Sequence, residues 1–330
     1  MTNFDHQQTA HCESGAVAAL LRHNGLDLSE PMVFGLSSAL TYAYIPLVKM
    51  GGMPLLAYRM PPGRIIRGLS KRLGIRFHFE RFRKPADGTA ALDHYLSQGY
   101  PVGLQASVYW LPYFPENMRF HFNAHNLVAY GKDGDDYLIS DPTFEQPMRA
   151  QTQALQRARF VKGMLAPKGL IYYPEPINTT PDLSRAIPEA IRATARMMLK
   201  TPLPFVGVRG IRHVARHMEK QSPANEHYNK LLIGHMVRMQ EEIGTGGAGF
   251  RFLFASFLQE SASILGNDGL VKAADQFTDA GDEWRRFALY AAKMLKGRSA
   301  LDYHKLAEQL RTVADMEQEG YRMLLALDLS

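Results

Sequence analysis

The residues best suited to chemistry in this sequence are its single cysteine, Cys12, and a histidine and an aspartate much further along the chain. Nucleophilic catalysis by cysteine needs a thiolate, a base that pairs with it and a group that orients the base. His125 begins an apolar stretch, and Asp141 ends the next one. Neighbouring antiparallel strands would bring that carboxylate beside the imidazole, so the sequence predicts a Cys12–His125–Asp141 triad.

Cys12 precedes a run of small and apolar residues that Asn24-Gly25 closes in the manner of a helix C-cap. We therefore expect a helix over residues 12–24 with Cys12 in its first turn. The unpaired N–H groups and the positive dipole end of a helix favour a thiolate over a thiol. Each of the three residues taken alone is more often structural than catalytic, so the prediction depends on all three together.

Length and composition exclude several classes of protein. A chain of 330 residues with 46% apolar and 21% charged residues is typical of about two globular domains. One cysteine excludes an internal disulfide, and no segment resembles a signal peptide or a membrane span, so we expect a cytoplasmic protein. The net charge of +6 comes from dispersed basic residues without a nucleic-acid-binding motif. Most of these residues are expected to form a solvated basic face, and an acidic protein partner is the functional alternative.

A metal site is not expected near His125. His121 and His125 are four residues apart, and on a strand they would lie about 13 Å from each other. That separation is too large for both rings to bind one ion.

The hydrophobic pattern changes near residue 178. Before it, helical spacing at 64–73, 89–98 and 150–165 mixes with strand-like stretches at 42–48, 54–58, 75–82, 101–108, 122–130, 136–140 and 169–173. After a proline-rich linker, helical spacing continues to the end, with breaks at 201–204, 244–249, 266–269 and 296–297. We expect an α+β fold, with a papain-like, cysteine-peptidase-type domain over residues 1–178 and an all-α domain of about five or six helices over residues 179–330.

Several motifs also resemble a known family. Residues 11–16 (HCESGA), 125–131 (HNLVAYG) and 138–142 (LISDP) are similar to the N-terminal domain of the butirosin-biosynthesis acyltransferases, called BtrH-type. They resemble more distantly the papain-like cysteine peptidases that process bacteriocins. Residues 246–251 (GGAGFR), with 254–258 (FASFL) and Trp284-Arg285, resemble the helical domain that accompanies that family.

The resemblance implies acyl transfer rather than proteolysis. In that family an acyl group moves from the phosphopantetheine arm of an acyl carrier protein to an amine. By resemblance, Cys12 attacks the carrier thioester and becomes acylated, His125 is the base, and Asp141 holds the imidazole. The implied partners are an acyl carrier protein and a small-molecule amine or hydroxyl acceptor, in natural-product or secondary-metabolite biosynthesis. No cofactor of the protein's own is implied, because the 4′-phosphopantetheine belongs to the carrier.

The oxyanion hole is less clear from the sequence. The related peptidases have a glutamine six residues before the cysteine, and this chain has His6 there. The neighbouring Gln7 and Gln8 are therefore candidate donors, together with the backbone N–H of Cys12.

Candidate substrate-binding residues lie in two places. Tyr109, Trp110 and Tyr113 form an aromatic loop shortly before His125 that suits either the wall of an acyl pocket or a packed turn. Arg251 follows a glycine-rich segment, where it can be structural or can reach the active site from the second domain.

Two functions from other classes stay open. A cysteine hydrolase (amidase, peptidase or thioesterase) would use the same three residues with water as the acceptor. A non-catalytic binding module would leave Cys12 buried and unreactive. The helical second domain also offers a surface for a homodimer.

Overall fold

The protein is described here by a computed structural model that covers residues 3–50 and 52–329. The chain divides into two compact units, each made of two segments. Unit 1 contains the residues up to Val33 together with Ile65–Pro181. Unit 2 contains Phe34–Arg64 and the residues from Asp182 onwards.

Unit 1 is built on a six-stranded antiparallel sheet with the order β3-β8-β4-β5-β6-β7. Its strands are β3 (Phe77–Glu80), β4 (Val102–Ala106), β5 (His125–Asp133), β6 (Asp136–Ser140), β7 (Met148–Gln151) and β8 (Ile171–Pro174). The central strands β4 and β5 are buried because apolar side chains project from both of their faces. The sheet joins strands from distant parts of the chain, so it fixes the geometry of unit 1.

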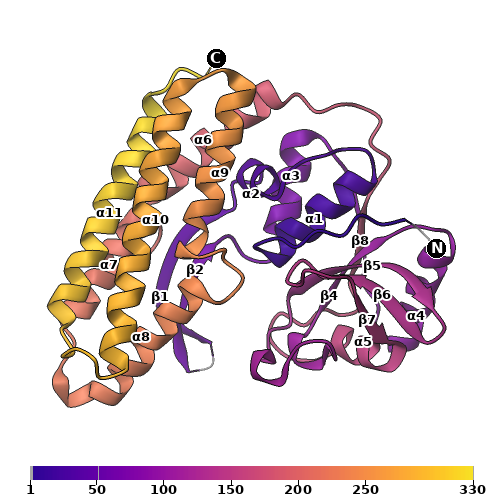
Figure 1. The fold of residues 1–330 in the computed structure, drawn as a ribbon, viewed down its shortest axis with the longest axis horizontal. Coiled ribbons are helices and arrows are strands. Elements are labelled where there is room, and N and C mark those ends of the chain that lie inside the picture. The colour runs from indigo at the N-terminus through magenta and orange to yellow at the C-terminus, as the bar shows by residue number, and fades with distance from the viewer. Residues whose placement is uncertain (1–2, 51, 330) are drawn as a thin grey trace. The chain divides into compact units, whose positions relative to one another are not determined.

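Helices cover both faces of this sheet (Figure 1). On one face, α1 (Cys12–His23) packs against β4, β5 and β8, and its residues from Glu13 to Leu21 are all buried. On the other face, α4 (Pro85–Ser97) and α5 (Thr152–Arg159) share a core with alternate residues of β4 and β5. Two further helices, α2 (Glu30–Leu36) and α3 (Arg64–Leu73), cross the boundaries between the chain segments of the two units.

The hairpin of β5 and β6 carries two of the predicted site residues at its open end. Its register pairs Asp133 with Asp136, so Gly134 and Asp135 form a two-residue turn. Gly134 has a φ of 59°, which favours glycine in a tight hairpin turn. The predicted antiparallel pair is therefore confirmed. Strand β7 was not predicted, because its sequence MRAQ is short and mostly polar.

Unit 2 combines a β-hairpin with helices. The hairpin is formed by β1 (Leu40–Met50) and β2 (Met53–Arg59). From residue 182 to residue 329, six α-helices follow, α6 (Leu183–Lys200), α7 (Gly207–Glu219), α8 (Glu226–Glu241), α9 (Arg251–Leu265), α10 (Asp268–Leu295) and α11 (Tyr303–Ala326). The four predicted breaks fall between helices, and a further one at residues 220–225 was not predicted.

The compact units differ from the expected domains at one segment. Hairpin β1–β2 groups with the C-terminal helices, where the rings of Tyr42 and Tyr58 lie 5.9 and 5.5 Å from the ring of Trp284. The elements of residues 182–329 are helices, as expected, and the compact unit that contains them also includes this hairpin. A domain boundary predicted from the sequence places each segment with the residues next to it in the chain. The apolar faces of β1 and β2 instead pack against the C-terminal helices, which are distant in sequence. The α+β class itself is confirmed.

Membrane-spanning helices were not expected. Within the described ranges, no helix combines the length and the hydropathy that crossing a bilayer requires.

Candidate active site

Cys12 is the first residue of α1, as predicted. The N-cap residue His11 has an extended backbone, and its ring Nδ1 accepts the backbone N–H of Ser14 at 3.3 Å. The first amides of an α-helix have no acceptor within the helix, and the helix dipole places partial positive charge there. A thiolate at Cys12 is therefore electrostatically favoured.

A buried carboxylate holds the chain that leads into Cys12. Glu30 accepts the backbone N–H of Ala10 on Oε2 at 2.8 Å and that of His11 on Oε1 at 2.7 Å. The Ser14 hydroxyl donates to the same Oε1 at 2.9 Å. Burial raises the pKa of Glu30, and these three hydrogen bonds only partly oppose that effect. Sequence reasoning missed this residue, because nothing near Glu30 in the chain shows that it contacts the nucleophile's turn.

His125 and Asp141 form a buried pair at the open end of the β5–β6 hairpin. His125 begins β5, Asp141 directly follows β6, and His125 Nε2 lies 2.7 Å from Asp141 Oδ2. The two side chains are 6% and 0% exposed, so water does not screen their attraction. The second carboxylate oxygen of Asp141 accepts the backbone N–H of Thr143 at 3.0 Å.

The electrostatics of this pair favour a charged imidazole. Burial alone would lower the pKa of His125, but the charge and hydrogen bond of Asp141 and a hydrogen bond with Cys12 raise it to about 10. Burial would likewise raise the pKa of Asp141, yet His125 and the hydrogen bonds to its carboxylate lower it overall. Because Nε2 faces Asp141, Nδ1 is the ring nitrogen left for the Cys12 sulfur. Cys12, His125 and Asp141 are thus linked by two consecutive hydrogen bonds, with His125 in the middle.

Tyr113 lies beside the carboxylate of the pair. Its hydroxyl donates to Asp141 Oδ2 at 2.9 Å, and the ring of the next residue, Phe114, stands edge-on to the His125 ring at 5.4 Å. The hydroxyl of Tyr113 is therefore occupied by Asp141 and is not presented to a substrate. A part for the Tyr113 ring in the wall of an acyl pocket stays a prediction.

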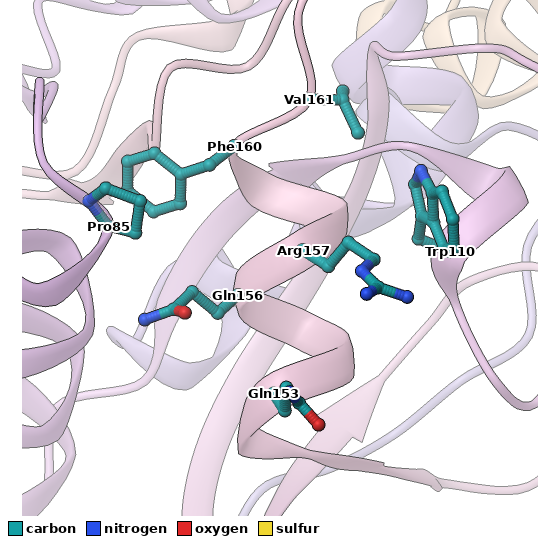
Figure 2. A pocket seen from close by; sticks show the side chains of 7 residues that line it. All are labelled: Pro85, Trp110, Gln153, Gln156, Arg157, Phe160 and Val161. Carbon is teal, nitrogen blue, oxygen red and sulfur yellow. The ribbon is translucent and has the colours of Figure 1, made fainter.

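Tyr109 and Trp110 lie at surface pockets instead of beside the cysteine. Trp110 and five residues from 153 to 161 contribute to one pocket of about 530 Å³, where the Arg157 guanidinium lies 4.6 Å from the Trp110 ring (Figure 2). Tyr109, which stacks on His121 at 4.2 Å, lines a second pocket of about 410 Å³ together with Trp110. Neither Cys12 nor His125 lines either pocket, so a substrate role for Tyr109 and Trp110 stays a prediction.

The candidate oxyanion donors Gln7 and Gln8 are exposed and engaged elsewhere. The amide of Gln7 donates to Asp5 at 3.2 Å, and that of Gln8 donates to the carbonyl oxygen of Thr143 at 3.2 Å. His6, at the position where the related peptidases have glutamine, bonds through its ring to Ser140 and to the carbonyl of Phe144. These hydrogen bonds engage all three side chains, and the oxyanion donors, Gln7, Gln8 and the backbone N–H of Cys12, stay predictions.

Arg251 is a core residue of unit 2 and does not face a substrate. Its guanidinium is fully buried, donates through Nε and Nη2 to Glu317 at 2.8 and 3.1 Å, and donates through Nη1 to the Gly249 carbonyl at 2.6 Å. Glu317 also accepts the indole N–H of Trp284 at 2.7 Å. Arg251 therefore has the structural role that the sequence analysis gave as an alternative, because its guanidinium donates to groups within unit 2.

Among the residues that the structure describes, no group of three or more His, Cys, Asp or Glu side chains could hold a metal ion.

Two family models match consecutive parts of the chain. Residues 153–324 match the family model of a domain of unknown function, DUF4872, which spans just over half of the chain, so the chain belongs to that family. Residues 11–142 match the model of the N-terminal part of butirosin biosynthesis protein H, which confirms the BtrH-type resemblance of the region that contains Cys12, His125 and Asp141.

One solved structure and the curated proteins complete the comparison. A C39-like peptidase from Bacillus anthracis is 14% identical, covers 55% of this chain and 96% of its own, and superposes with a TM-score of 0.37. A score below 0.5 is too low for any argument about fold or activity. A comparison with curated proteins found no match.

Proposed function

We propose that this protein is an acyltransferase that carries the acyl group on Cys12. The observation that carries the proposal is the hydrogen-bonded arrangement of three residues: the half-buried Cys12, at the start of α1, hydrogen-bonds to His125, and the buried His125 hydrogen-bonds to the buried Asp141. A thiolate paired with an imidazolium is the state that attacks an activated acyl group. The match of residues 11–142 to the butirosin biosynthesis protein H model supports transfer as the outcome.

The acyl donor in this proposal is the thioester of an acyl carrier protein. The Cys12 sulfur attacks the thioester carbonyl, and the resulting oxyanion is stabilised by the Cys12 backbone N–H. The carbon–sulfur bond to the carrier then breaks, and the carrier thiol leaves with the proton of His125. The products of this half-reaction are the free carrier and an acyl group on Cys12.

The acceptor in the second half-reaction is an amine or a hydroxyl. His125 removes the acceptor's proton as the acceptor attacks the acyl-Cys12 carbonyl, and the Cys12 thiolate leaves and pairs again with the imidazolium. Asp141 stabilises the imidazolium throughout and does not itself take up the proton. Such a reaction suits secondary-metabolite biosynthesis in the cytoplasm, where the Cys12 thiol stays reduced.

The net positive charge of the chain supports a carrier protein as donor. A net charge of +6 would attract an acidic carrier protein and increase the rate at which the two proteins associate. Raised ionic strength should then slow acylation by the carrier more than acylation by a small pantetheine thioester.

Product analysis separates this function from hydrolysis. The protein is incubated with an acyl-carrier thioester and a mixture of amine acceptors, and the products are identified by mass spectrometry. Amide or ester formation that is lost in Cys12→Ala supports transfer. Free acid alone, formed at the same rate with and without acceptors, would establish a cysteine hydrolase instead.

A further inference from the structure

The loop between β4 and β5 carries a side chain that holds the His125–Asp141 pair from outside the triad. We propose that Tyr113 is a positioning residue for the reaction of Cys12, because its hydroxyl fixes the Asp141 carboxylate that orients and charges His125. This inference rests on the proposed function and gives a role to the hydroxyl of a residue that the sequence places either in an acyl-pocket wall or in a packed turn.

Tyr113 and His125 both donate a hydrogen bond to the same oxygen atom of Asp141. Asp141 Oδ2 receives the Tyr113 hydroxyl at 2.9 Å and His125 Nε2 at 2.7 Å, and Oδ1 receives the Thr143 amide at 3.0 Å. An ionised carboxylate only accepts hydrogen bonds, so all three groups donate. Rotation of the carboxylate would break at least one of these bonds, and the three donors together therefore define the plane in which His125 is held.

The protonation states are those the proposal requires. Burial and the neighbouring Asp141 charge raise the pKa of Tyr113 well above its usual value, so the phenol remains a donor. Its hydrogen bond contributes, after those of His125 and Thr143, to the lowered pKa of Asp141. Asp141 is the partner that keeps His125 charged, so Tyr113 acts on Cys12 through two intervening groups.

The loop that carries Tyr113 is itself fixed on both sides of that residue. The Arg119 guanidinium donates from Nε to the Phe114 carbonyl and from Nη2 to the Pro112 carbonyl, each at 2.8 Å. The Phe114 ring meets His125 at an interplanar angle of 89°, an edge-to-face contact that limits rotation of the imidazole. One guanidinium thus holds the backbone before and after Tyr113, while the two aromatic side chains contact Asp141 and His125.

The test is the pH dependence of Cys12 alkylation, which needs no acyl substrate. Rates with iodoacetamide are followed by intact mass for the wild type, for Tyr113→Phe and for the matched control Tyr100→Phe, an exposed tyrosine of the same unit. Tyr113→Phe removes one oxygen atom and leaves the ring to pack. The acid limb of its profile should move up by about one pH unit or less, because a less firmly held Asp141 leaves the His125 imidazolium less well placed to stabilise the Cys12 thiolate.

A spectroscopic readout complements the kinetics. In protein with ¹⁵N-labelled histidine, the proton on His125 Nε2 should shift and exchange faster with water in Tyr113→Phe than in the wild type or Tyr100→Phe. Thermal unfolding of each variant shows whether the fold is kept, and the resonance reports the His125–Asp141 bond even if stability falls.

The outcomes separate the two proposals. Alkylation profiles and His125 resonances that are the same in Tyr113→Phe and the wild type would overturn the positioning role and leave the proposed function intact. A wild-type Cys12 that reacts with the profile of an ordinary thiol would overturn the proposed function and the role of Tyr113 with it. A shifted acid limb, with an unshifted Tyr100→Phe profile, supports both.

Discussion

His125 Nε2 and Asp141 Oδ2 lie 2.7 Å apart, and both side chains are buried. Asp141 raises the pKa of His125, and His125 lowers the pKa of Asp141. The pair is made by a hairpin, so its geometry depends on the register of β5 and β6 and not on a flexible loop. That relationship determines how stability and reactivity respond to pH.

The first prediction concerns stability against pH. The pKa of His125 rises from 6.5 to about 10 on folding, so its contribution is fully present below 6.5 and is lost as pH rises through 10. The lowered pKa of Asp141 gives a contribution that is present above 3.8 and is lost as pH falls through the lowered value. Urea denaturation should therefore show a broad maximum between these limits. In His125→Gln the loss of stability on the alkaline side should be smaller; an unchanged alkaline slope would contradict the shifted His125.

A second prediction concerns the carboxylate of the pair. Asp141→Asn keeps the shape of the side chain but removes the charge that raises the pKa of His125. Iodoacetamide alkylation of Cys12 at pH 6 should slow by about tenfold or more, and acyl transfer should fall by about 10²- to 10⁴-fold. The exposed Asp27, which pairs with Arg22 on the surface, offers Asp27→Asn as a control with no expected effect. Equal alkylation rates in Asp141→Asn and the wild type would count against the charge coupling.

Glu30 gives a third prediction. Glu30→Gln replaces one acceptor oxygen by an amide donor, which would face the backbone N–H of Ala10 or that of His11. The free energy of unfolding should fall by about 1–3 kcal/mol, and Cys12 should lose reactivity because the turn before α1 loosens. Glu189→Gln, which breaks only an exposed pair with Arg185, should change stability by less than about 0.5 kcal/mol. Denaturation and alkylation are measured on both variants, and equal effects would contradict the role of Glu30.

The buried Arg251–Glu317 pair gives a fourth prediction. Arg251→Met leaves the Glu317 charge buried without its cation and should destabilise the protein by about 3–5 kcal/mol. The double variant Arg251→Met with Glu317→Gln should recover part of that loss. Under conditions where the variant is folded, its Cys12 alkylation profile should match the wild type. A selective rise in KM for the acyl donor, without loss of stability, would restore a substrate-binding role for Arg251.

Local patterns were sufficient to predict much of unit 1. The apolar run after Cys12 predicted α1, and the two apolar stretches around Gly134 predicted the hairpin that places His125 and Asp141. These elements are specified by residues close in sequence, through caps, turns and periodicity. The class of the fold and the expected neighbours in the site followed from them.

The missing parts depend on contacts that no local pattern contains. Glu30 reaches the turn before Cys12 from another helix, and the Tyr113 hydroxyl meets Asp141 across a long loop. Hairpin β1–β2 has ordinary strand patterns, but nothing in them shows that Tyr42 and Tyr58 pack on Trp284. Gln7 and Gln8 were inferred from a motif position, and their exposed side chains bond elsewhere.

The mass of the protein after a short incubation with an acyl-carrier thioester and no acceptor shows most directly whether Cys12 carries the acyl group. We expect a mass increase of one acyl group, localised to Cys12 by peptide mapping, absent in Cys12→Ala and discharged when an amine acceptor is added. An unmodified Cys12 with every thioester donor tested, or an acyl group on another residue that persists in Cys12→Ala, would contradict it.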